Sequence, residues 1–381
     1  MHSRLEGGEH IPVFAPCVGP DTLAHLAEAI DVGWLGMGAA TKEFEDRISA
    51  FLGLHDRFVV ATNTGTSALH IALRAAGIGP GDEVITPSFN YVADHQAIHA
   101  AGAQVVMCDV RETDLGIDCE KAAQLCGPKT RAIVPLHFAG VPCDLAGVYE
   151  LAAQHGLRVI EDACHAFGST KDGQRIGSFG DIAVFSFDPV KVITSIDGGC
   201  VVARDPREIE QLHHLRLLGV DKDTTERYKN RRAWEYDVVS EGYRYHLTNI
   251  LAAVGISQIK RADEFIATRQ AVCERYSRAF SQIDGLAVLA SDFRHISPFI
   301  YSLRVLSGRR SALIEHLRAR EIDCGIHFIP VHRHAYFASA RRGDMTVTER
   351  IVDEVLTLPL HSCMREAFVE RVIEGVRSFF S

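Results

Sequence analysis

The sequence predicts an α/β fold with a large, mainly parallel sheet and a smaller α+β domain at the C-terminal end. Between residues 59 and 203, short apolar segments alternate with helix-length segments. This alternation is typical of βαβ units, whose right-handed crossovers place neighbouring strands in parallel. Beyond Phe280 the pattern changes to short strand-like runs. With 381 residues and 47% hydrophobic residues the chain can bury a large core, and we place the two domains at 1–245 and 246–381.

Charge and composition argue against several classes of protein. A formal net charge of −9 opposes sequence-independent binding of nucleic acid, which needs a cationic surface. The ten cysteines form no C-x-x-C pair and the nineteen histidines no H-E-x-x-H pair, so we expect free thiols and no metal site. The apolar runs fall short of the roughly 20 residues that span a bilayer, and the first residues lack an apolar signal region. We therefore expect a cytoplasmic protein without membrane association.

Two amphipathic helices are predicted near the N-terminus, on either side of the turn GWLGMG. Apolar residues recur at helical spacing between Asp21 and Leu52. Trp34 lies on the turn itself, where a tryptophan is a common contact with a substrate or a partner. Packing against a neighbouring domain would explain Trp34 equally well.

The first strand–helix unit contains a candidate phosphate cradle. A short strand, Val59 to Ala61, precedes the segment TGTSAL at 64–69, which begins a helix that runs to Ala76. Such a turn presents free backbone N–H groups at a helix N-terminus, where the helix dipole also attracts an anion. Serine and threonine cap most helices, however, so capping alone could account for this pattern.

The next strand–helix units place two notable residues where strands end. Tyr91 follows a strand at 82–86 and begins a predicted helix, so its ring can either stack on a flat ligand or cap the core. Asp162 follows the last of three further strands, at the sheet edge where α/β proteins collect ligands, although it could be an ordinary cap. These strands are predicted at 105–108, 132–136 and 157–160, with helices near 118–126 and 144–155 between them.

A single lysine stands on the connection between two more apolar runs. The runs Ile182–Phe187 and Cys200–Ala203 are predicted to be buried strands, and Lys191 lies between them. Burial lowers the pKa of an amine and makes it a nucleophile towards carbonyl groups, as a Schiff-base lysine requires. The alternative is a surface lysine on a hairpin.

One long helix is predicted to link the two domains. From Ser240 the apolar positions continue towards Tyr276, and a helix of this length usually joins two domains or lies on a dimer face. The smaller domain follows, with strands expected at 286–290 and 301–306, a helix at 311–320 and a last helix at 366–380.

The residues around Lys191 resemble those of a known family. The segment contains Phe185, Ser186, Phe187, Lys191, Thr194, Asp197, Gly198 and Gly199 in order. This pattern resembles the lysine segment of the DegT/DnrJ/EryC1/StrS family, sugar aminotransferases of fold type I, the aspartate aminotransferase-like class of pyridoxal 5′-phosphate enzymes. TGTSAL, EDACHA at 161–166 and GYRY at 242–245 resemble further family motifs in the same order. The resemblance extends from about Trp34 to about His361.

This resemblance implies roles for particular residues. Lys191 would bind pyridoxal 5′-phosphate as a Schiff base and then move protons, and Asp162 would keep the pyridine nitrogen protonated. The other implied cofactor contacts are Thr66, Ser67 and Ser186 at the phosphate, Tyr91 and His165 at the ring, and Arg244 from the second subunit of a homodimer with shared active sites. Substrate contacts are expected among Trp34, His327 and His332.

The chain departs from the family beside these sites. Asn90 and Asp94 stand where threonines are usual, and Arg244 and His246 stand where asparagine and arginine are frequent. Contacts beside the cofactor ring and across the subunit interface are therefore expected to differ from those of other members.

The resemblance also implies a reaction. An amino group would pass from glutamate to a keto group, at C3 or C4, of a nucleotide-linked deoxysugar, for the biosynthesis of a surface polysaccharide or a glycosylated metabolite. Other family chemistry is an alternative, either dehydration of a sugar or amination of a non-sugar ring. Lys191 weighs against those dehydratases that have replaced this lysine. A second alternative is a non-catalytic regulator that only binds the cofactor or a sugar nucleotide.

Overall fold

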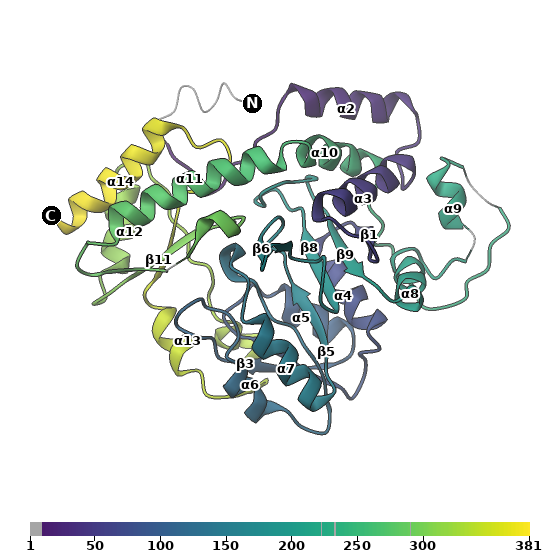
Figure 1. Cartoon of the computed structure of the whole chain (residues 1–381), viewed down its shortest axis with the longest axis horizontal. Helices are drawn as coiled ribbons and strands as arrows, with labels where there is room; N and C mark the ends of the chain where they lie inside the picture. Colours follow the sequence, from purple (N-terminus) through teal and green to yellow (C-terminus); the bar gives the residue numbers. More distant parts are fainter. Residues whose placement is uncertain (1–9, 222, 232–233, 290) are drawn as a thin grey trace.

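An eight-stranded sheet forms the centre of the larger part of the molecule (Figure 1). The computed structural model describes residues 10–221, 223–231, 234–289 and 291–381. In spatial order the strands are β1 (Phe58–Thr62), β9 (Gly199–Ala203), β8 (Ile182–Ser186), β5 (Arg158–Asp162), β4 (Thr130–Ile133), β2 (Glu83–Pro87), β3 (Gln104–Cys108) and β12 (Arg341–Arg342). Strand β9 runs antiparallel to both of its neighbours, whereas the other neighbouring pairs are parallel. The prediction of a mainly parallel α/β sheet is confirmed.

Each face of this sheet carries its own apolar core. In β1, Val59 and Ala61 belong to one cluster and Val60 between them belongs to the other, because successive side chains point to opposite faces. One face packs against α3 (Ala39–Leu52), α6 (Cys119–Leu125), α7 (Leu145–His155) and α10 (Asn249–Ile259). The other face packs against α4 (Gly65–Ala75), α5 (Ala93–Ala100) and α8 (Pro206–Arg216). Burial on both faces explains why the strands read as nearly continuous apolar runs.

A three-stranded antiparallel sheet forms the smaller part of the molecule. Its order is β10 (Leu286–Val288), β11 (Tyr301–Val305) and β13 (Val355–Leu358), and it shares a core with α11 (Ala262–Phe280), α12 (Arg310–Arg318) and α14 (Glu366–Phe380). Ile11 belongs to the same core, because its backbone bonds to Glu321 at 2.7 Å and Asp323 at 2.9 Å. The first described residues therefore pack with the C-terminal part. The division at residues 245 and 246 remains a prediction.

The prediction of one long helix from Ser240 to Tyr276 is wrong. Residues 240–248 are not helical, and a turn at Lys260 and Arg261 separates α10 from α11, which follow one another along the top of Figure 1. The physical reason lies in tertiary hydrogen bonds. Tyr245 accepts from the Asn63 N–H at 2.7 Å and donates to the Arg216 carbonyl at 3.0 Å, so its backbone is already bonded to other segments.

Further helices, strands and turns connect these parts of the molecule. They are α2 (Pro20–Asp31), α9 (Asp223–Tyr228), α13 (Thr346–Ile351), β6 (Thr170–Lys171), β7 (Gln174–Arg175) and 3₁₀ turns at Phe138–Gly140, Phe293–His295, Val331–Arg333 and Ala335–Phe337. Ala290, which ends a predicted strand, lies outside the described residues, as do the first nine residues of the N-terminal region. Within the described part of the chain, no helix combines the length and the apolar character that a membrane span needs.

A buried ion pair ties α3 to α8 beside the sheet. Arg216 is fully buried and donates to the Glu45 carboxylate at 2.6 Å and to the Ala61 carbonyl at 2.9 Å. Glu45 in turn accepts from the Ala61 N–H at 2.9 Å. Since both charged groups are shielded from water, the charge of each is neutralised mainly by the other.

We therefore predict that Glu45→Ala lowers the free energy of unfolding by about 3–5 kcal/mol, because it leaves the Arg216 charge buried without its partner. Glu43→Ala is the matched control on the same helix: it removes an exposed ion pair with Arg47 and should cost only about 0.3–0.5 kcal/mol. Urea denaturation followed by circular dichroism measures both values. Equal losses in the two variants would contradict the importance of the buried pair.

Candidate active site

A cavity of about 440 Å³ opens at the carboxyl ends of the parallel strands β2, β5 and β8. Its walls come from the segments that follow these strands, from the first turn of α4, and from Phe299 and residues 327–328 of the smaller part. Ligands of α/β proteins collect at this edge of the sheet. The cavity is therefore the candidate active site.

Lys191 lies on the connection between β8 and β9, as predicted, and lines the cavity. The Phe187 N–H donates to the Gly198 carbonyl at 2.8 Å, which closes the base of this connection. The Lys191 ammonium nitrogen, Nζ, lies 4.1 Å from the centre of the Phe299 ring. Burial lowers the pKa of the Lys191 amine below its ordinary value, although nearby acidic groups oppose this shift. A larger fraction of the amine is therefore neutral, and a neutral amine is nucleophilic.

Asp162 ends β5 and lines the same cavity. Its backbone is held on both sides, because its N–H donates to the Pro135 carbonyl at 2.9 Å and its carbonyl accepts from the His137 N–H at 3.1 Å. The side chain accepts from the Cys164 N–H at 3.0 Å, and the residue is only 4% exposed. A fixed, desolvated carboxyl group of this kind can hold a proton on a basic atom of a ligand.

The first turn of α4 is held in shape by a reciprocal cap. The Thr64 hydroxyl accepts from the Ser67 N–H at 2.9 Å, and the Ser67 hydroxyl lies 3.1 Å from the Thr64 N–H. The Ser67 side chain also bonds to Asn63 at 2.7 Å and does not line the cavity. Gly65 and Thr66, which begin the helix, do line it.

Two glycines allow backbones to approach closely around this turn. A Cβ atom on Gly65 would lie 2.8 Å from the Ser186 Cβ, and a Cβ atom on Gly199 would lie 2.5 Å from the Thr64 carbonyl oxygen. Any other residue at either position would force the segments apart. The start of α4, the end of β8 and the start of β9 consequently meet beside the cavity.

Aromatic rings from distant segments form another wall of the cavity. The rings of His165 and Phe299 stack with centres 4.3 Å apart, and Phe328 lies 5.7 Å from His165 and 5.9 Å from Tyr91. Burial lowers the pKa of His327 to about 4 and lowers the pKa of His165 well below its ordinary value, and the Lys191 charge adds to both shifts. Both imidazoles are therefore neutral at physiological pH.

The structure gathers most, but not all, of the predicted site residues. Lys191 and Asp162 share the cavity with Thr66, Tyr91, His165, Ser186 and His327. Trp34, Ser67, Arg244 and His332 do not line it within this chain.

Trp34 donates its indole N–H to the Met37 carbonyl at 2.8 Å, and Arg244 is exposed on the segment before α10. His332 bonds to Ser88 at 2.7 Å and Glu349 at 2.6 Å. The roles proposed for these four residues stay predictions.

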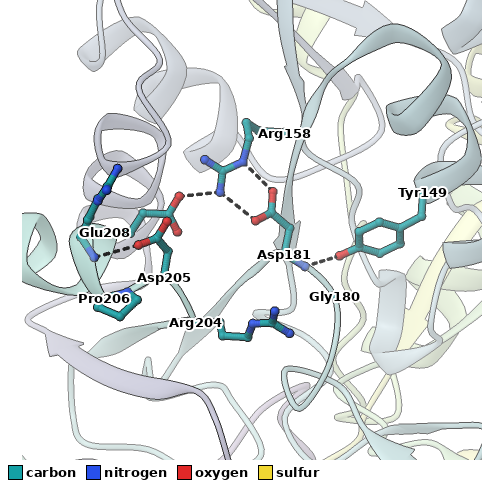
Figure 2. Close-up of a pocket in the computed structure, with 9 residues that line it drawn as sticks. Tyr149, Arg158, Gly180, Asp181, Arg204, Asp205, Pro206 and Glu208 are labelled. Carbon is teal, nitrogen blue, oxygen red and sulfur yellow. Dashed lines mark hydrogen bonds and ion pairs between the residues drawn. The ribbon is translucent and has the colours of Figure 1, made fainter.

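A second, larger hollow of about 940 Å³ lies at the opposite edge of the sheet, where β5 and β8 begin. Three of its charged side chains form ion pairs with one another. Figure 2 shows Arg158 between Asp181 and Glu208, with a distance of 2.7 Å to each carboxylate. Because these partners are already paired across an open surface, we assign the active site to the smaller cavity.

The comparison with protein families matches residues 16–377 to the DegT/DnrJ/EryC1/StrS aminotransferase family. The chain belongs to this family. The resemblance inferred from the residues around Lys191 is thus confirmed, and the protein is an aminotransferase.

Individual relatives agree with this assignment over the whole chain. The spore coat polysaccharide biosynthesis protein SpsC of Bacillus subtilis is 36% identical over 377 residues, 96% of each chain. The crystal structure of the aminotransferase TlmJ from Streptoalloteichus hindustanus is 34% identical, with a TM-score of 0.89 over 97% of this chain and 98% of that one. The PLP form of the putative sugar aminotransferase Spr1654 from Streptococcus pneumoniae is 26% identical, with a TM-score of 0.89 over the same shares. Spr1654 has also been solved in PMP and apo forms. The predicted fold type I is confirmed.

Sequence reasoning missed several residues of the cavity. Phe14 and Phe299 line it, but they come from segments that no local pattern connects with Lys191. Asp94 also lines it, together with Asp162. The replacement of a usual threonine by Asp94 predicted different contacts beside the cofactor ring, but it did not predict a second carboxyl group in the cavity with Asp162.

We predict that Lys191 reacts with acetic anhydride at lower pH than an exposed lysine does, because burial lowers its pKa. The sign follows from the chemistry: only the neutral amine reacts, and a lower pKa makes the amine neutral at lower pH. Isotope-coded acetylation of the cofactor-free protein between pH 6 and pH 10, read by mass spectrometry, gives the midpoint for each lysine. Exposed Lys171 serves as the internal reference. Coinciding midpoints would contradict the shift.

Proposed function

We propose that this aminotransferase moves an amino group from glutamate to the keto group, at C3 or C4, of a nucleotide-linked deoxysugar. The observation that carries the proposal is the placement of Lys191, Asp162 and the first turn of α4 around one cavity. A sugar substrate is supported by SpsC, which is named for spore coat polysaccharide biosynthesis, and by Spr1654, described as a putative sugar aminotransferase. The product would serve a surface polysaccharide or a glycosylated metabolite.

The cofactor is pyridoxal 5′-phosphate, and the cavity fits it in size and in chemistry. A volume of about 440 Å³ lies within the roughly 300–1,000 Å³ of small-molecule sites. Helix α4 begins beside the cavity at Gly65, whose missing side chain leaves its N-terminus open to a phosphate next to Ser186. Asp162 supplies the carboxyl group that a pyridine nitrogen requires. When bound, this cofactor supplies an electron sink for the carbanion that forms during amino transfer.

Three hydroxyl groups line the cavity at the N-terminus of α4, those of Thr64, Thr66 and Ser186. Thr64 is engaged in the helix cap, and we assign phosphate binding to Thr66 and Ser186. Ser67 supports the same turn from behind, because its side chain completes the cap with Thr64. This cap keeps the first N–H groups of the helix directed outward, where the helix dipole favours an anion. A direct contact between Ser67 and the phosphate remains a prediction.

Lys191 and Asp162 would divide the acid–base work. Because its pKa is lowered, more of the Lys191 amine is neutral, so this residue would hold the cofactor through the carbonyl group of the cofactor and would carry protons during amino transfer. Asp162 would hold a proton at the ring nitrogen. The Phe299 ring lies against Lys191 Nζ and excludes water from that side, so proton transfer is confined to bound partners. His165 stacks on Phe299 and would lie at the cofactor ring with Tyr91.

The open side of the cavity would receive the nucleotide sugar. Tyr91 is 58% exposed there, and its ring faces Phe328. His327 lines the same cavity and remains a candidate donor to the substrate. Both ring nitrogens of His332 are already bonded, so this residue would contact a substrate only if its bonds to Ser88 or Glu349 were exchanged. Trp34 remains a candidate contact on its turn.

The proposal includes a cytoplasmic homodimer with shared active sites. Arg244 supports this idea, because its side chain is exposed and lies outside the cavity of its own chain. Apolar residues near it in the sequence are exposed as well, and Trp234 is 86% exposed. Tryptophan and arginine are enriched in protein interfaces. Arg244 of one subunit would then approach the cofactor phosphate of the other.

The amino donor and acceptor can be tested as separate half-reactions. We expect glutamate alone to change the absorbance of the bound cofactor from the pyridoxal to the pyridoxamine form, and a keto-sugar nucleotide to reverse the change. Lys191→Ala should abolish both changes, because it removes the nucleophile and proton carrier. A stopped-flow spectrum records each step, and mass spectrometry identifies the aminated carbon. If only small keto acids reverse the change, the sugar assignment is wrong.

Shared active sites can be tested with two inactive variants. We expect mixtures of Lys191→Ala and Arg244→Ala subunits to regain part of the activity, because one site of a mixed dimer then contains both native residues. Cofactor titration should show that Arg244→Ala alone binds pyridoxal 5′-phosphate at least about tenfold more weakly, as expected for loss of an arginine–phosphate contact. Absence of recovery in dimers whose subunit exchange is proven by mass spectrometry would exclude the cross-subunit role.

A further inference from the structure

Asp94 is a second carboxyl group in the active-site cavity. It lies in the first turn of α5, is only 1% exposed and lines the cavity together with Asp162. Acidic residues are almost never fully buried unless they are paired. The burial of Asp94 therefore requires a partner that explains it.

Asn90 holds one oxygen of Asp94 in place. The Asn90 side-chain carbonyl accepts from the Tyr91 N–H at 2.6 Å, which turns the amide N–H₂ group of Asn90 towards Asp94. This amide donates to Asp94 Oδ2 at 2.7 Å. The orientation of the Asp94 carboxyl group is consequently set from its own side of the cavity.

The buried carboxyl groups of Asp94 and Asp162 line the same cavity, and Asp162 is near enough to raise the pKa of Asp94. Two ionised carboxylates offer only acceptors and repel one another, so a pair of this kind needs one proton between them. Burial and the neighbouring Asp162 charge raise the pKa of Asp94 well above its ordinary value. Asp94 is thus the member of the pair that keeps the proton.

We propose that Asp94 is a positioning residue that donates a shared proton to Asp162 and holds that carboxylate in the orientation that meets the ring nitrogen of the cofactor. Only the contact between Asp162 and the ring nitrogen of the cofactor rests on the proposed function. A pair with one shared proton carries a single negative charge, which matches a single positive charge on a protonated ring nitrogen. Two ionised carboxylates would leave one buried charge without compensation.

The surroundings of Asp94 agree with this charge count. The ionisable groups that interact electrostatically with Asp94 are Asp162, Cys164 and Lys191. His165, Asp188, Asp197 and His327 also line the same cavity. Burial raises the pKa of the Cys164 thiol and lowers the pKa of the Lys191 amine. The raised pKa keeps the Cys164 thiol neutral, so the two carboxyl groups do not share their surroundings with a thiolate charge.

The shared proton can be tested first in the cofactor-free protein. For a carboxyl group whose folded pKa is raised, the stabilising effect is complete below the unfolded pKa of about 4 and is lost as the pH rises through the folded pKa. Asp94→Asn keeps the shape and an N–H donor towards Asp162 but cannot ionise. Its melting temperature should match the wild type near pH 4.5 and exceed it by about 2 °C or more at pH 8.5. A difference that does not change with pH would overturn the shared proton.

The positioning role requires a second measurement, the affinity for pyridoxal 5′-phosphate. Asp94→Asn should bind within about threefold of the wild type, whereas Asp94→Val, of similar size but without a donor, should bind at least about tenfold more weakly. Equal binding by the Asn and Val variants would overturn the positioning role. If the wild type itself fails to bind the cofactor, the proposed function fails, while the pH dependence of melting still tests the shared proton independently.

Discussion

The close approach of Gly199 to the Thr64–Gly65 turn is the constraint on which the site depends. Gly199 pairs with Thr62 at the end of β1 and with Ser186 at the end of β8, because β9 runs antiparallel between these two strands. The helix that begins at Gly65, the hydroxyl of Ser186 and the connection that carries Lys191 therefore converge on one residue without a side chain. A change in the register of β9 would separate the anion site from the lysine.

Sequence reasoning succeeded where local pattern and topology determine position. Asp162 ends β5, while Thr66 and Lys191 lie on the segments that follow β1 and β8. Because these strand ends meet at one edge of the sheet, the proximity of the three residues follows from the order of the elements. Sequence reasoning failed where the position of a residue depends on which distant segment it bonds to or packs against. The backbone of Tyr245 bonds to residues outside its own segment instead of forming a helix, and the rings of Phe14 and Phe299 reach the cavity from distant parts of the chain. No periodicity in a single segment encodes such contacts.

Burial shifts the pKa values of the bases and of the buried acid Asp94 in opposite directions, and in both cases it favours the neutral form. It lowers the pKa of Lys191, His165 and His327 and raises that of Asp94, so desolvation favours the neutral form of each. The Phe299 ring lies against Lys191 and stacks on His165, so it covers one side of both groups. In such a desolvated site the charges of bound ligands are poorly screened.

The attachment of the first described residues to the smaller part has a consequence for biosynthesis. Ile11 bonds to residues 321 and 323, and Val13 accepts from the Leu360 N–H at 3.1 Å, so these contacts span more than 300 residues of chain. Phe14, which lies next to them, supplies part of the cavity wall. On the ribosome, strand β5, which ends at Asp162, and the connection that carries Lys191 are synthesised long before residue 360. Contacts of such high sequence separation form late in folding, so the part of the wall that Phe14 supplies closes only after the chain beyond residue 360 has been made.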